Sequence, residues 1–90
     1  MPGAHRVLLN AIGANMILHL IHFGPLRDQR GCAQESLDVV VTTPRELYAC
    51  CGFTLAETSI AVAVNDDVVA WDQPLASGDT VIFLPPVSGG

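Results

Sequence analysis

The sequence GDTVIFLPPVSGG, residues 78–90, decides the fold expected for this chain. Its apolar run Val81–Leu84 contains β-branched and aromatic residues and predicts a strand. Pro85 and Pro86 must end that strand, because proline fixes φ and offers no amide donor to a neighbouring strand. We therefore expect an apolar strand that leads out of a folded body at Leu84.

The six residues after this strand predict an extended tail, residues 85–90; they are Pro85, Pro86, Val87, Ser88, Gly89 and Gly90. About five extended residues reach roughly 16 Å. The two glycines lack side chains, so the backbone of another protein or a nucleotide can approach them closely. The α-carboxylate of Gly90 is the group here best suited to chemistry. Terminal glycines are often merely frayed, so the preceding residues must decide between the two interpretations.

Composition restricts the class of protein. Ninety residues suit one small domain, and half of them are apolar while only 14% are charged, which excludes the disordered class. The net charge is −5, with arginine as the only basic residue type apart from histidine. Such a chain is a poor ligand for nucleic acid, since binding to phosphates needs basic side chains. It suits a partner protein with a basic cleft.

The thiols and imidazoles do not predict a metal site. Cys32, Cys50 and Cys51 contain no CxxC pair, which fits neither a disulfide framework nor a zinc pattern and is consistent with a reducing, cytoplasmic location. His19 and His22 lie in one expected strand and point to opposite faces of it. We therefore predict that the chain binds no metal.

The N-terminal residues 1–15 are expected to lie outside the domain, which we assign to residues 16–84. Residues 7–24 are apolar enough to suggest a membrane span, but asparagine and histidine residues interrupt them. A signal peptide is equally unsupported, because one arginine precedes the apolar stretch and no clear cleavage site follows. No membrane association is expected, although residues 1–15 could dock on the domain as an extra segment.

The remaining pattern predicts five strands around one main helix. The expected strands are residues 16–23, 37–41, 60–64, 68–71 and 81–84. A capping-box sequence, Thr43 to Glu46, starts a helix over residues 44–51, and residues 28–34 are expected to form a loop. The order ββαβββ fits the α+β class and the β-grasp (ubiquitin-like) fold, a mixed sheet of about four to five strands with the first and last parallel at its centre. No catalytic motif argues for an autonomous enzyme.

The C-terminal string resembles the ubiquitin-like sulfur carriers of the MoaD/ThiS type, a family that includes the small subunit of molybdopterin synthase. The likeness rests on Gly78-Asp79-Thr80, the apolar strand and PPVSGG. It extends to the hairpin sequence AVNDDVV, residues 63–69, and to FGPLRD, residues 23–28. It covers about residues 16–90, although residues 44–59 are shorter than is usual in the family and residues 1–15 have no counterpart in it.

The resemblance implies a mechanism in which this chain binds no cofactor itself. An E1-like activating enzyme would use ATP to adenylate the Gly90 carboxylate, and a sulfur donor protein would convert it to a thiocarboxylate. The tail would then enter the large subunit of molybdopterin synthase, in a heterotetramer, to deliver sulfur to the pterin precursor. Catalysis would take place in the partners' active sites.

The resemblance also implies a docking surface. Phe23, Val68 and Leu84 would form an exposed apolar patch shared by both partners, with Arg27 adding an ionic contact. The alternative is that all three apolar residues belong to the core. Three other functions stay open: a carrier for thiamine, thiolated tRNA or a secondary metabolite; a ubiquitin-like modifier joined to lysines of target proteins; and an inert binding module.

Overall fold

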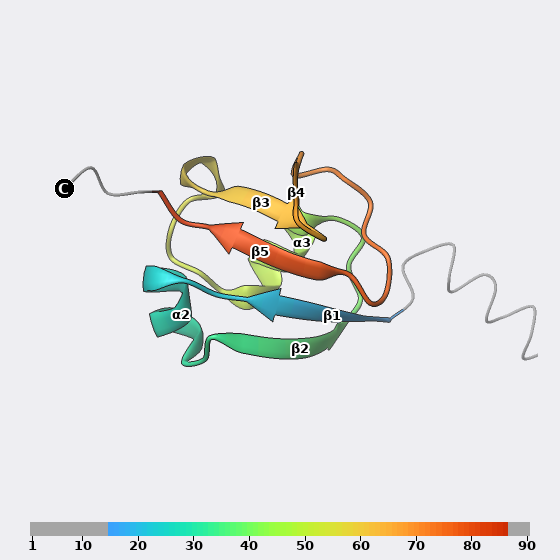
Figure 1. Ribbon diagram of the computed structural model, residues 1–90, viewed down its shortest axis with the longest axis horizontal. Helices are drawn as coiled ribbons and strands as arrows, with labels where there is room; N and C mark the ends of the chain where they lie inside the picture. The colour runs from blue at the N-terminus through green and yellow to red at the C-terminus, as the bar shows by residue number, and fades with distance from the viewer. Residues whose placement is uncertain (1–14, 87–90) are drawn as a thin grey trace, which may run out of the picture.

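The computed structural model describes residues 15–86, which form one mixed sheet covered on one face by a helix (Figure 1). The sheet has five strands in the order β2-β1-β5-β3-β4. The elements follow the chain as β1 (Met16–Ile21), α2 (Gly24–Arg30), β2 (Gln34–Val39), α3 (Pro44–Cys51), the 3-10 helix η1 (Glu57–Ser59), β3 (Ala61–Val64), β4 (Asp67–Val69) and β5 (Thr80–Leu84). This architecture confirms the predicted β-grasp fold.

The first and last strands lie side by side at the centre of the sheet, as predicted. β1 and β5 run parallel, with Leu20 opposite Val81, while β1 pairs antiparallel with β2 and β3 pairs antiparallel with β4 and β5. A strand with neighbours on both sides exposes no backbone edge. The three strands richest in apolar residues, β1, β5 and β3, therefore occupy the three inner positions, in which backbone groups can be paired on both sides.

The core lies between the sheet and α3. In Figure 1 this helix lies behind the sheet, while α2 lies beside the end of β1 and the start of β2. Leu18, Leu20, Val81 and Phe83 are fully or almost fully buried and point toward the helix side. The alternation predicted for β1 and β5 is thus confirmed, and the opposite side chains of both strands point to the open face.

Helix α3 begins and ends as its sequence predicts. The Thr43 side chain accepts a hydrogen bond from the Glu46 amide at 3.3 Å, and Gly52 ends the helix at φ 72°. Glu46 reaches back one residue further than a capping box requires, because its Oε1 accepts from the backbone amide of Thr42 at 2.6 Å. The Thr43 side chain thus satisfies one free amide of the first turn, while the Glu46 carboxylate pairs with the amide just before the cap.

The prediction of a loop over residues 28–34 is wrong, because helix α2 covers Gly24–Arg30 and β2 already begins at Gln34. Gly24 and Pro25 were expected to break the first strand, but they form the start of this helix. Proline suits the first helical turn, where its missing amide hydrogen is not needed. The buried side chain of Leu26 attaches the helix to the core, and Gly31 ends it at φ 76°. Tertiary burial therefore stabilises a helix too short to be evident in the sequence.

Strand bounds differ from prediction by one or two residues elsewhere, apart from the start of β2, which lies at Gln34 and not at residue 37. The end of β2 lies at Val39 and not at residue 41. β1 ends at Ile21 and β4 at Val69, short of the predicted residues 23 and 71. The predicted connection over residues 53–59 contains η1. Among the described residues, no helix is long and apolar enough to cross a membrane.

Candidate functional site

The open face of the sheet carries a continuous apolar row. The register places Ile21 opposite Ile82, Ile82 opposite Ala63, and Ala63 opposite Val68. These four side chains cross β1, β5, β3 and β4 on the side away from α3. Directly opposite residues in neighbouring strands lie close enough to form one surface.

The next row toward the C-terminal end of β5 enlarges this surface. Leu84 lies opposite Ala61, and Phe23 shares the alternation of β1 side chains that brings Ile21 to the same face. We call the set of larger side chains the apolar patch; it consists of Phe23, Ile21, Ile82, Leu84 and Val68.

The predicted patch residues are not core residues. Phe23 is 48% exposed and Val68 is 71% exposed, while Leu84 is half-buried. The structure thus brings the three together on one face, and their role in binding stays a prediction. Ile21 and Ile82 were missed as site residues, although strand alternation in the sequence already placed them on this face.

The start of the tail lies at the edge of the apolar patch. β5 ends at Leu84, and the ring of Pro85 lies beside Gly24, where an added Cβ would approach its Cγ to 3.8 Å. Pro86 is exposed. The predictions for Val87, Ser88, Gly89 and Gly90, and for an extension over residues 1–14, lie outside the described residues.

Arg27 lies on α2, one helical turn after Phe23. Its side chain is exposed, and within residues 15–86 it forms no ion pair. A free guanidinium one turn from an exposed aromatic ring is suitably placed to meet an acidic group of a partner. An isolated exposed ion pair of this kind contributes little energy but adds to specificity.

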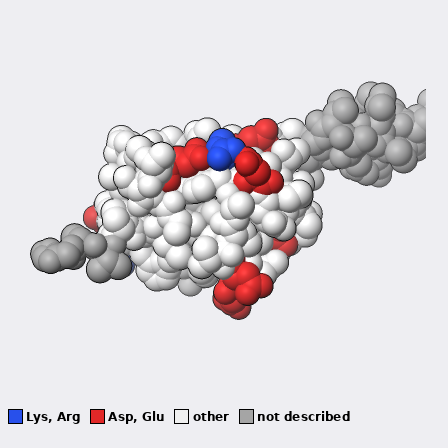
Figure 2. Space-filling view, turned by 90° about the horizontal axis from the view of Figure 1, so that it is seen from above, with Lys and Arg blue, Asp and Glu red and all other residues white. Residues whose placement is uncertain are grey.

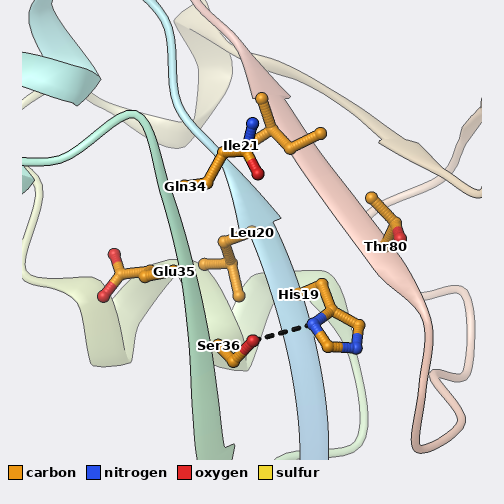
Figure 3. A pocket seen from close by; sticks show the side chains of 7 residues that line it. All are labelled: His19, Leu20, Ile21, Gln34, Glu35, Ser36 and Thr80. Atoms are coloured by element: carbon orange, nitrogen blue, oxygen red, sulfur yellow. Dashed lines mark hydrogen bonds between the residues drawn. The ribbon is translucent and has the colours of Figure 1, made fainter.

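A polar group interrupts the open face in the middle of β1. His19 lies between Ser36 of β2 and Thr80 of β5, and its Nδ1 is 2.8 Å from the Ser36 hydroxyl oxygen (Figure 3). These side chains line a shallow pocket together with Ile21. The polar group around His19 therefore separates the apolar patch near the tail from Ile17, which is 44% exposed on the same face at the start of β1.

The two other arginines that the structure describes each belong to a local ion-pair network. Arg30 donates from Nε and Nη2 to the two oxygens of Glu35 at 2.7 and 2.8 Å, and this pairing lowers the pKa of the Glu35 carboxyl to about 2. Arg45 pairs with Glu57 and Asp72. Seen from above, the surface is mostly uncharged, with acidic groups gathered around a basic one (Figure 2). The cations in these networks are already neutralised, unlike Arg27.

Comparison with known proteins agrees with this geometry. The ThiS family model matches residues 20–90. The molybdopterin synthase sulfur carrier subunit of Escherichia coli (strain K12) is 47% identical over 36 residues, covering 40% of this chain and 44% of that protein. The match thus spans less than half of the curated relative's length.

Two solved structures share the fold over most of this chain. One is a complex of subunits 1 and 2 of the molybdopterin-converting factor from Helicobacter pylori, 29% identical with a TM-score of 0.56, covering 83% of this chain and 100% of that chain. The other is SAMP1, the small archaeal modifier protein 1, from Haloferax volcanii, 25% identical with a TM-score of 0.65, covering 82% of this chain and 99% of that chain. The family match over residues 20–90, on a body with the β-grasp topology, establishes that this chain belongs to the ThiS family.

Proposed function

We propose that this chain is a sulfur carrier of the MoaD/ThiS type and acts as the small subunit of a molybdopterin synthase. The apolar patch binds the large subunit, and residues 85–90 reach into its active site. The Gly90 carboxylate is first adenylated by an E1-like activating enzyme that uses ATP. A sulfur atom supplied at the oxidation level of sulfide by a sulfur donor protein then displaces AMP and leaves a thiocarboxylate. The location proposed for these steps is the cytoplasm.

One observation carries this proposal: the apolar patch continues to the residue at which the tail begins. Leu84 is both a patch residue and the residue before Pro85. A partner that covers the patch is therefore already beside the start of the tail, and about six residues of extended chain then span roughly 20 Å. The E. coli relative and the H. pylori complex support molybdopterin synthesis as the pathway.

The first test measures the chemistry of the terminus. The chain is incubated with activating enzyme, ATP and a sulfur donor, and its intact mass is measured. We expect one oxygen to be replaced by sulfur, with no change in a variant that lacks Gly90. A Cys50→Ser variant, which leaves the tail and the apolar patch unchanged, is the control and should react like the parent chain. Sulfur loading of the variant without Gly90 would refute the proposal.

The second test measures docking. Leu84→Asp and Val68→Asp should each weaken binding of the large subunit at least about tenfold, since an unpaired charge would be buried in the interface. Val40→Asp is the control. Val40 is 58% exposed, but it follows the last residue of β2, whereas the first residue of β2 is the one that pairs with Ile21 of the apolar patch. Equal affinities of all three variants in titration calorimetry would contradict the assignment of the apolar patch.

A ubiquitin-like modifier is the second candidate, because a small archaeal modifier protein has the same fold and 25% identity. A modifier joins its terminus to lysines of other proteins, whereas a carrier releases its sulfur and is recovered unchanged. Denaturing gels of cells that express a tagged chain distinguish the two. Adducts that require Gly90 would favour the modifier, and their absence beside a detectable thiocarboxylate would favour the carrier.

A further inference from the structure

Three potential metal ligands that are not adjacent in the sequence meet on the helix side of the sheet. His22 follows β1, Cys32 lies in the turn after α2, and Glu35 belongs to β2. One ring nitrogen of His22, the Cys32 sulfur and a Glu35 carboxylate oxygen all lie within 4.8 Å of one another. Imidazole, thiolate and carboxylate together are a ligand set that suits zinc.

The histidine of this cluster is buried and incompletely satisfied. His22 is 1% exposed, and its Nε2 is 2.7 Å from Oε2 of Glu35. Its Nδ1 has no hydrogen-bond partner among the described residues. An ion bound beside Glu35 would contact Nε2 and not Nδ1, so the unpartnered Nδ1 does not itself indicate a metal. What the cluster offers is a buried imidazole within reach of a thiol and a carboxylate.

We propose that His22, Cys32 and Glu35 bind one zinc ion, in a site separate from the apolar patch and independent of the proposed sulfur chemistry. The ion would replace the proton between His22 Nε2 and Glu35 Oε2. The proton of the Cys32 thiol would leave to solvent, and the imidazole would stay neutral with its proton on Nδ1. A water molecule would complete a four-coordinate site, entering from the hollow that Cys32 lines together with Arg27 and Asp28.

Small movements suffice to form this site. Ligand atoms around a tetrahedral zinc ion lie about 3.3 Å apart, from the usual zinc–ligand distances of about 2.0–2.3 Å. The 2.7 Å contact of His22 with Glu35 would therefore lengthen by about half an ångström, and the Cys32 sulfur would approach from at most 4.8 Å. Cys32 lies in a partly exposed turn, where such an adjustment is easiest.

The charges of the cluster are compatible with a divalent cation. A thiolate and the Glu35 carboxylate would offset the two charges of the ion. Arg30, which donates to both oxygens of Glu35, would stay as an outer-sphere partner, so the cluster would carry one net positive charge. Cys51 is a poorer candidate ligand, since burial raises the pKa of its thiol to about 11.

Titration of the untagged, metal-free chain with Co²⁺ tests the proposal. We expect visible d–d bands of a four-coordinate ion and a thiolate-to-metal band in the near ultraviolet, both displaced by Zn²⁺. Cys32→Ser should abolish the thiolate band and weaken affinity at least tenfold. Cys50→Ser is the matched control, because Cys50 is exposed and outside the cluster, and it should bind like the parent chain. His5→Ala, outside the described residues, should also bind normally.

A measurement on the unaltered chain guards against misfolded variants. Zn²⁺ should slow alkylation of Cys32 by iodoacetamide at least tenfold, while the rate at Cys50 stays constant. Binding of Co²⁺ without a thiolate band, or a thiolate band that survives Cys32→Ser, would overturn the proposal. Equal alkylation rates of Cys32 with and without Zn²⁺ would overturn it as well.

Discussion

Neighbouring residues of β5 should separate stability from binding. Phe83 is fully buried, with its ring stacked on Trp71 at a centroid distance of 5.7 Å and edge-on to Tyr48 at 5.0 Å. Leu84, the next residue, points to the open face. We expect Phe83→Ala to destabilise the fold with little direct effect on the apolar patch. Leu84→Asp should disrupt the apolar patch and leave the stability of the fold almost unchanged.

The size of the first effect follows from the burial. Replacing a fully buried phenylalanine by alanine costs about 3–5 kcal/mol, from lost transfer free energy and the cavity that is left. A domain of this size has a stability of about 5–8 kcal/mol. Phe83→Ala should therefore lose about half of its free energy of unfolding or more. Leu84→Asp should stay within about 1 kcal/mol of the parent chain, because its side chain is only half-buried.

Urea unfolding followed by circular dichroism and by tryptophan fluorescence measures both effects. Trp71 is the only tryptophan of the chain and stacks on Phe83, so its emission should change in Phe83→Ala even before unfolding. Phe83→Leu is the control and should recover most of the loss, because it refills the cavity. Two results would refute the assignment of the two faces. One is a loss of free energy of unfolding below about 1.5 kcal/mol for Phe83→Ala, and the other is a loss for Leu84→Asp that exceeds the loss for Phe83→Ala.

Three further predictions concern α3. Thr43→Ala removes the side-chain acceptor of the first turn and should reduce stability by about 1 kcal/mol in chemical unfolding, whereas Thr43→Ser should not. Tyr48→Phe removes a hydrogen bond of 2.7 Å to the Leu55 carbonyl and should cost about 1 kcal/mol in the same assay; an unchanged midpoint would argue against that bond. Hydrogen bonds from Thr42 lower the pKa of Glu46 below 4.5, so its contribution to stability should be present above pH 4.5 and disappear in more acidic solution. Glu46→Gln should then differ from the parent chain near neutral pH and converge with it in acid, and a constant difference would contradict this reasoning.

Local signals account for the parts of the fold that were predicted well. The capping sequence from Thr43 and the glycine at residue 52 delimit α3 in the sequence because both act through contacts within a few residues. Side-chain alternation in β1 and β5 likewise predicts which residues face the core, since a strand has a period of two. The apolar patch around Leu84 could be outlined from the same alternation and from family resemblance.

What the sequence determined by itself was the order of the five strands and α3, the faces of β1 and β5, and the end of β5 at Pro85. Only the tertiary structure decided that residues 24–30 form a helix, because burial of Leu26 against the core outweighs a weak local preference. Only the tertiary structure brought His22, Cys32 and Glu35 together. Ligand spacing in the sequence is uninformative when strand pairing and a short helix, which are long-range contacts, set the distances between side chains.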